Sequence, residues 1–317
     1  MLAYIIRRIL IMVPLLIFVT AFVFLLGQYG AADMAMEMTL RINDNVFDAE
    51  LYAAIQKNLG LDQPIWTRYT KFILNALRGD FGVSYALPGT PDIARMIITT
   101  LPISLQLGLA ALFLLTIVGI PLGVFAAVYR NRFLDFFIVT GTTTISSIPP
   151  FVLAPIALVV LVSQLKILPT TGFGWHGLFS RETLLPAAVL AAGPLLGVVR
   201  FTRAAVIDVL AQDYVRAARA RGLNESMVVS KHVVKNAMTP VLTVLGLTTG
   251  RLLSGSIFIE TVFGINGFGD VAVSAFQSGD IQTVAATTLV SGAIVVVMNL
   301  VVDVLYGVLD PRVRVNV

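Results

Sequence analysis

MIITTLPISLQLGLAALFLLTIVGIPLGVFAAVY, residues 96–129, runs for 34 residues without a charged side chain. An α-helix needs about 20 mostly apolar residues to cross a bilayer, because the hydrocarbon offers no hydrogen-bond partner to an exposed backbone group. The whole chain of 317 residues shares this bias, with 57% hydrophobic and 13% charged residues. A soluble domain has about 45–50% apolar and about 25% charged residues. The sequence therefore predicts an integral membrane protein.

Five more apolar stretches are long enough to cross a bilayer. Four of them carry no charge, and the last contains a single cation, Arg251. They are residues 9–27, 136–165, 183–199 and 281–302 and, with the arginine, 236–259. The predicted fold is all-α, with six transmembrane helices and both termini on the same side of the membrane.

The placement of basic residues predicts the orientation. With the N-terminus in the cytoplasm, the cytoplasmic segments hold thirteen Lys and Arg residues, whereas the short outer loops hold two, Lys166 and Arg181. The segment between the first two spans holds six more, but long translocated segments contribute little to orientation. Because Lys and Arg in short loops favour the cytoplasmic side, both termini are predicted to be cytoplasmic.

Composition and motifs argue against several other classes of protein. The absence of cysteine excludes a disulfide framework, a thiolate metal site and a cysteine nucleophile. The net charge of +4, from 22 basic and 18 acidic residues, is too small an excess to indicate nucleic-acid binding. The two histidines, His176 and His232, are isolated, so no metal site is predicted. No GxxxxGK[ST] phosphate loop occurs, so we expect neither nucleotide nor any other cofactor on this chain.

The first span and the segment after it leave two alternatives open. The apolar run at 9–27 exceeds the roughly 7–15 residues of a signal-peptide core, so residues 1–28 are predicted to be a retained anchor. Residues 29–95 are then extracytoplasmic. Such a segment can contain a helix that lies on the membrane or one that docks a soluble partner. Its apolar residues recur at the spacing of one helical face: Ile65, Tyr69, Phe72, Ile73 and Leu77.

Residues 208–236, between the fourth and fifth spans, form the most distinctive hydrophilic segment. Residues 212–221 contain no proline or glycine and stop at Gly222, a residue suited to follow a helix C-terminus. Asn224 suits the N-cap of a second short helix, and Glu225 is favourable in its first turn. The segment predicts a helix–Gly–helix elbow on the cytoplasmic face. The simpler alternative is a loop that only satisfies the positive-inside rule.

The elbow reads YVRAARARGLNESMVVSKHVVKNAMTPVL over residues 214–242 and resembles the EAA loop of ABC-importer permeases. Ala217, Ala218 and Gly222 match the family's alanine pair and its glycine. Arg216 stands where the general pattern has Glu and Lys235 where it has Pro, as in the dipeptide/oligopeptide/nickel branch. The B-type permease of that branch is similar along nearly the whole chain. The matching segments are YIIRRILIMVPLL, LGLDQPIWTRYTKF, LRGDFGVSY, LPISLQLGLAALFLLTIVGIPLGVFAA, SIPPFVLAP, KILPTTGFG and ETVFGINGFG.

The resemblance implies the transmembrane fold of a type I ABC importer, with the core permease domain at residues 96–317. The chain would form half of the translocation pathway for di- or oligopeptides in the cytoplasmic (inner) membrane, beside a second, C-type permease. Two ABC ATPase subunits would bind ATP and Mg²⁺, and an extracytoplasmic binding protein would deliver the substrate. The family's ATPase-coupling contact falls on Tyr214, Arg216, Ala217, Ala218, Gly222 and Leu223.

Three departures from the branch pattern lie on the predicted outer side. GAADMAMEM follows the first span in place of a proline-rich element, Asn266 replaces a proline, and SGDIQ around Asp280 replaces a third element. Because outer segments would meet the substrate or its binding protein, the cargo stays open. A nickel chelate or another small solute is the alternative to a peptide.

Two ionisable residues near the fifth span are candidates for the substrate pathway. A charge inside a span costs about 2.5–3.5 kcal/mol on insertion scales, so Arg251 needs a partner or a water-filled path. Arg251 either lines the pathway or pairs with an acid such as Asp303. Glu260 is a second pathway candidate, with an interfacial acid near the end of a span as its plainer interpretation.

Two rival classes make different demands on the sequence. An intramembrane enzyme needs a nucleophile with a general base at matching depth, and no predicted span contains a histidine, so we expect no enzyme. An ATP-independent secondary transporter usually carries midplane carboxylates and internal repeats, and neither is evident. Such a transporter has no ATPase to dock and would tolerate loss of the elbow helix.

Overall fold

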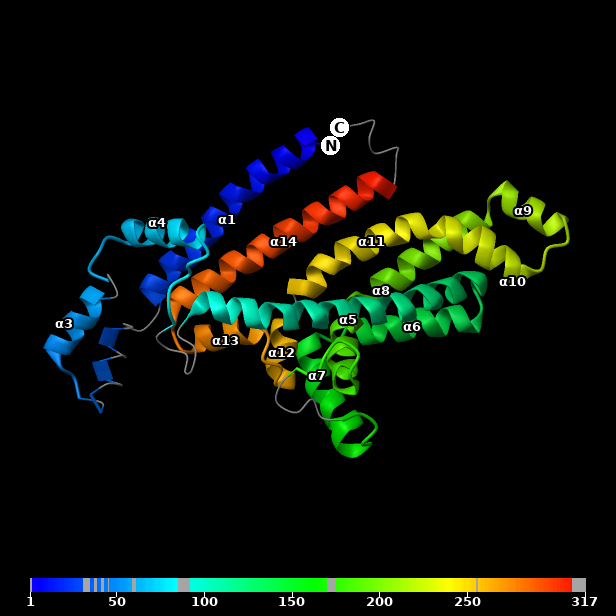
Figure 1. Ribbon diagram of the computed structural model, residues 1–317. Helices are drawn as coiled ribbons and strands as arrows, with labels where there is room; N and C mark the ends of the chain where they lie inside the picture. Colours follow the sequence, from blue (N-terminus) through cyan, green and yellow to red (C-terminus); the bar gives the residue numbers. More distant parts are fainter. Residues whose placement is uncertain are drawn as a thin grey trace. The chain divides into compact units, whose positions relative to one another are not determined.

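The structure is a computed structural model that describes residues 2–30, 35–36, 39–40, 43–44, 46–58, 61–84, 92–169, 175–254 and 256–309. Within these ranges the named elements are all helices. One isolated β-bridge pairs Val83 with Asp92. The elements, whose α-helices are labelled in Figure 1, are α1 Leu2–Gly30, α3 Ala49–Asn58, α4 Ile65–Ala76, α5 Ile93–Val128, α6 Phe133–Ser146, α7 Pro150–Ala157, η1 Leu158–Gln164, α8 Arg181–Leu210, α9 Asp213–Ala220, α10 Glu225–Met227, η2 Val228–Val234, α11 Lys235–Ser254, α12 Ile257–Phe263, α13 Phe268–Gln277 and α14 Ile281–Leu309.

The chain divides into two compact units. The first contains Met1–Ile5, Ile103–Asn266 and Val295–Val317, and the second contains Ile6–Pro102 and Gly267–Ile294. The three-part division expected from the sequence, at residues 1–28, 29–95 and 96–317, concerns the sides of a membrane. It stays a prediction.

Three helices are long and apolar enough to cross a membrane: α5, α8 and the Ile281–Met298 part of α14. Two bent pairs, α6 with α7–η1 and α12 with α13, raise the number to as many as five among the described residues. The all-α membrane fold is thereby confirmed. The count of six spans, and the cytoplasmic termini, stay predictions.

The third predicted span, residues 136–165, is a bent pair of helices rather than one straight helix. α6 ends at Ser146, α7 begins at Pro150, and the two directions differ by 99°. The cause is the Ile148-Pro149-Pro150 sequence. A proline disfavours helical dihedrals in the residue before it and has no N–H for the helical ladder. The span was predicted from the absence of charged residues alone, and that criterion does not detect a break in the helix.

The first unit is built around α8, which packs on α11, α6 and α7. α5 meets α8 through two glycines one helical turn apart. A Cβ built on Gly119 would lie 3.0 Å from a methyl group of Val198, and one on Gly123 would lie 2.5 Å from the Cβ of Thr202. Such small residues let two helices approach closely. This GxxxG pair therefore forms part of the α5–α8 contact within the chain.

The second unit joins α4 to α1. Phe24 of α1 stacks on Phe72 of α4, with ring centroids 6.0 Å apart. The Tyr69 hydroxyl donates to the carbonyl oxygen of Ile17 at 2.6 Å and lies 2.8 Å from Thr20 Oγ1. The predicted apolar face of α4 is confirmed for Ile65, Tyr69, Phe72 and Ile73, which pack into this cluster. Leu77 falls after the end of α4 and is 81% exposed.

Candidate functional site

The elbow predicted between the fourth and fifth spans is present in the first unit. α9 is followed by Gly222, whose φ of +78° lies in the left-handed region that favours glycine. Asn224 then caps α10, because its side-chain oxygen accepts from the Ser226 amide at 3.0 Å. Figure 1 shows α9 and α10 at one end of α8 and α11. Both local predictions, the glycine turn and the asparagine cap, are confirmed.

The second arm of the elbow is continuous with a long helix. α10 passes directly into the π-helical turn η2, and η2 passes into α11, so helix runs without a break from Glu225 to Ser254. The second arm of the elbow is therefore the beginning of the α11 helix rather than a separate short helix.

The inner face of the elbow packs against the helix ends below it. Val215 and Ala218 of α9 are buried in a cluster with Val228 and Val233 of η2 and Val206 of α8. Burial of four valines removes apolar surface from water at about 25 cal/mol per Å². This small core fixes the orientation of α9.

The outer face carries most of the residues predicted to contact a partner. Tyr214 is 44% exposed, and Arg216, Ala217 and Gly222 are also exposed. Leu223 is half-buried and packs against the inner cluster. Ala218 is buried and lies on the inner face of α9. The structure thus brings the six predicted residues to one elbow and divides them between its two faces.

Two polar contacts hold this outer face. The guanidinium of Arg219 donates to Glu225 through Nε at 3.0 Å and Nη2 at 2.6 Å, on opposite sides of Gly222. This hydrogen-bonded pair lowers the pKa of the Glu225 carboxyl below its usual value and raises the pKa of Arg219. The Asn236 side-chain amide donates to the Tyr214 hydroxyl at 3.2 Å. Sequence analysis missed both contacts, since six and 22 residues separate the partners.

The two pathway candidates lie on the following helices. Arg251 belongs to α11, but its side chain lies outside the described residues, as does that of Asp303. Glu260 of α12 is fully buried and accepts a hydrogen bond from the Ser256 hydroxyl. The Glu260 carboxylate is therefore enclosed within the protein. A pathway role for either residue stays a prediction.

Among the described residues no group of three His, Asp or Glu side chains could hold a metal ion. His176 and His232 lie on separate segments, one before α8 and one in η2. The outer face of the elbow carries exposed small and aromatic residues over a packed apolar cluster.

Apolar helices long enough to span a bilayer, with a packed helical elbow directly after one of them, α8, define a membrane-embedded protein. Comparison with known proteins gives the family. Residues 119–315 match the binding-protein-dependent transport system inner membrane component family, and residues 1–105 match its N-terminal component. The chain belongs to this family of ABC-importer permeases.

Full-length relatives agree with this assignment. The chain is 37% identical over 321 residues to the oligopeptide transport system permease protein AppB of Bacillus subtilis, covering 99% of this chain and 100% of AppB. It is 37% identical over 317 residues to the glutathione transport system permease protein GsiC of Escherichia coli K12, covering 99% of both. A chain of the inward-facing MetNI methionine ABC transporter has a TM-score of 0.55 at 17% identity, covering 68% of this chain and 97% of that one, and shows the shared fold.

Proposed function

We propose that this chain couples substrate passage to ATP hydrolysis on separate ATPase subunits, and that the elbow is the docking contact. The observation that carries the proposal is the unbroken helix from Glu225 to Ser254. A flexible loop would absorb a push from a partner, whereas a helix passes it on to the span. The elbow therefore supplies the mechanical link that alternating access needs.

The proposed contact uses the exposed side of the elbow. Ala217 lets a partner approach closely, Tyr214 and Arg216 offer aromatic and hydrogen-bonding contact, and Gly222 makes the turn. Ala218 and Leu223 pack behind them and hold the contact in place. Arg219 and Glu225 brace the turn from the side. The buried valine cluster holds α9, which carries Tyr214, Arg216 and Ala217.

The proposed assembly contains two different permeases, this chain and a C-type companion, in the cytoplasmic membrane. Two ABC ATPase subunits bind ATP and Mg²⁺ and meet the elbows from the cytoplasm, while an extracytoplasmic binding protein delivers the substrate. In this arrangement residues 1–28 anchor the chain, residues 29–95 lie outside, and residues 96–317 form the permease core with its coupling segment at 208–236. No catalytic step is assigned to this chain.

The proposed cargo is a short peptide. The names of the relatives AppB and GsiC, an oligopeptide and a glutathione permease, support this class of substrate. A nickel chelate or another small solute is the alternative, because the same membrane scaffold can serve different binding proteins. An ATP-independent secondary transporter is the second alternative, and it predicts that loss of α9 would be harmless.

Co-purification of the ATPase with substituted chains tests the docking contact. Ala217→Trp places a large ring on the proposed contact, and Ala211→Trp places the same ring on an exposed residue two positions before α9. We expect the tagged Ala217→Trp chain to recover at least about tenfold less ATPase from gently solubilised native membranes, as for a central interface contact. The Ala211→Trp chain should recover the wild-type amount.

Equal thermal unfolding of the two variants checks that the loss is not misfolding, since both residues are exposed. ATPase recovered in wild-type amount by the Ala217→Trp chain would contradict the docking contact. A chain that moves solute in liposomes without ATP would instead support the secondary transporter.

A further inference from the structure

An open cleft of about 970 Å³ lies in the first unit, at the turn between α5 and α6 and beside α8. It is unrelated to the elbow contact. Three arginines and one aspartate line it, together with exposed phenylalanines. The lining residues are Asn131, Arg132, Phe133, Asp135, Phe136, Val139, Thr140, Arg200 and Arg203.

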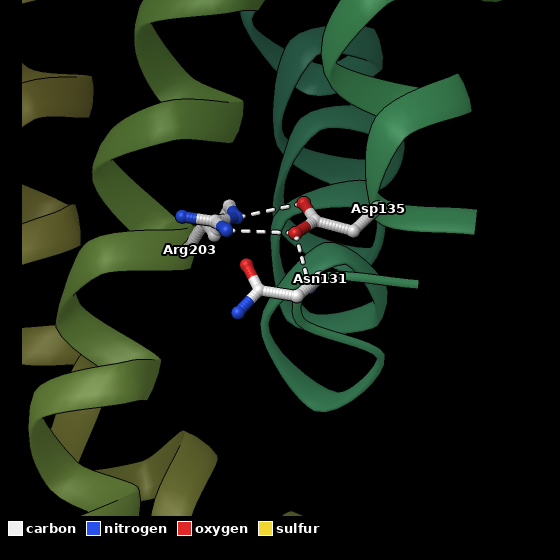
Figure 2. Close-up of polar contacts among 3 residues, drawn as sticks. All are labelled: Asn131, Asp135 and Arg203. Carbon is white, nitrogen blue, oxygen red and sulfur yellow. Dashed lines mark hydrogen bonds and ion pairs between the residues drawn. The ribbon is translucent and has the colours of Figure 1, made fainter. Parts of the chain in front are cut away.

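The single carboxylate of the cleft is fully engaged. Arg203 donates to Asp135 through Nε at 2.8 Å and through Nη2 at 2.7 Å, and the backbone N–H of Asn131 donates to the same carboxylate at 2.9 Å (Figure 2). Such a two-bond pair fixes both partners and balances their charges. The Asp135–Arg203 pair therefore forms a neutral wall between α6 and α8.

The other two arginines have no acid to balance them among the described residues. Arg132 and Arg200 are both exposed, and Arg200 donates a long hydrogen bond, of 3.5 Å, to Thr143 Oγ1. Because the only aspartate of the cleft already serves Arg203, the cleft has a net positive charge. It offers two guanidinium groups to an anion.

The rim of the cleft is apolar and exposed. Phe133 is 81% exposed and Phe136 69% exposed, and Phe133 stacks on Phe137 with ring centroids 6.2 Å apart. These rings begin α6, which is part of a candidate span. A ligand that fits must therefore carry a negative group next to long apolar chains. A free phosphate satisfies the arginines but leaves the phenylalanines without a partner.

We propose that this cleft binds the headgroup of an anionic phospholipid, with its phosphate on Arg132 and Arg200 and its acyl chains along Phe133 and Phe136. Guanidinium groups suit phosphate because their planar N–H donors match its oxygens in pairs. Basic clefts between transmembrane helices at the cytoplasmic boundary are suited to such headgroups. The predicted orientation places Arg132 at that boundary. The proposal does not depend on the elbow docking an ATPase.

Native mass spectrometry of the full chain in mild detergent tests this site, with phosphatidylglycerol as the probe and phosphatidylcholine as the neutral comparison. The test variant is Arg132→Gln with Arg200→Gln. The matched control is Arg78→Gln with Arg181→Gln, which removes two exposed arginines outside the cleft and on the predicted outer side. We expect the test variant to bind phosphatidylglycerol about thirtyfold more weakly, since two juxtamembrane cations contribute about 2 kcal/mol. The control should bind as the wild type does.

Three results would overturn the proposal. Equal phosphatidylglycerol binding by the test and control variants would show that the cleft does not hold the lipid. Displacement of phosphatidylglycerol by millimolar inorganic phosphate would assign the cleft to a free anion. Unchanged lipid binding combined with loss of co-purifying protein would assign it to a protein partner. Wild-type preference for phosphatidylglycerol, lost only in the test variant, supports the headgroup site.

Discussion

The guanidinium of Arg219 reaches across the Gly222 turn to the carboxylate of Glu225, with 2.6 Å between Nη2 and Oε1. This pair joins α9 to the start of the helix that becomes α11. Both side chains are about half exposed, so the pair adds little to global stability. Its contribution is local, because it closes the only turn between the two arms of the elbow.

The pair predicts that the elbow loosens at low pH. The pKa of Glu225 is lowered in the folded chain by its hydrogen bond to Arg219, so the stabilisation is complete above the ordinary carboxyl pKa near 4.5. It is lost as the pH falls through the lowered value. Amide exchange over residues 213–235, corrected for intrinsic rates, should speed up below pH 4.5. An Arg219→Gln chain should exchange fast already at neutral pH, and wild-type protection in that variant would contradict the bracing role.

Gly222 gives a second prediction, about backbone strain. A Cβ at this position would meet nothing within 4 Å, so the cost of Gly222→Ala comes from its φ of +78° rather than from a clash. We expect a loss of about 1–2 kcal/mol, measured locally by amide exchange across the elbow. Gly222→Asn should lose less, because asparagine tolerates the left-handed region. Equal effects of the two substitutions would argue against strain as the cause.

Gly123 gives a third prediction, about helix packing. A Cβ there would lie 2.5 Å from the Thr202 Cβ and 2.8 Å from the Val199 carbonyl oxygen, so α5 must move away from α8. Gly123→Ala should lower the free energy of unfolding by about 1–3 kcal/mol, read as a lower melting temperature in detergent. Gly141→Ala in α6 is the matched control, since nothing lies within 4 Å of its Cβ. A Gly123→Ala melting temperature equal to that of the control would contradict the close α5–α8 contact.

Local signals in the sequence were enough to predict the elbow. Gly222 marks a turn because few other residues accept its dihedral angles, and Asn224 marks a helix start because its side chain reaches the Ser226 amide. Both effects depend on neighbours within a few residues. The family-wide motif around Ala217 placed the same segment independently.

The features that the sequence did not predict depend on contacts between residues that are distant in the chain. Asp135 and Arg203 are 68 residues apart, so no periodicity pairs them. Ala217 and Ala218 look alike in the motif, yet only packing against Val206 and Val233 shows that Ala218 faces inward. The 99° bend after Ser146 was readable in Ile148-Pro149-Pro150, but uninterrupted apolarity suggested a straight span.

Cross-linking from Ala217 tests the central claim most directly, because the chain has no cysteine and Ala217→Cys would introduce a unique thiol. A short thiol-reactive photocrosslinker on this residue, in the assembled transporter, should capture an ATPase subunit, identified from the mass of the linked peptide. Ala211→Cys, carrying the same reagent, should capture far less. Capture of an ATPase peptide from residue 217 but not from 211 is the predicted result. No ATPase capture at residue 217 in a transporter that hydrolyses ATP and moves its cargo would contradict the elbow as the coupling contact.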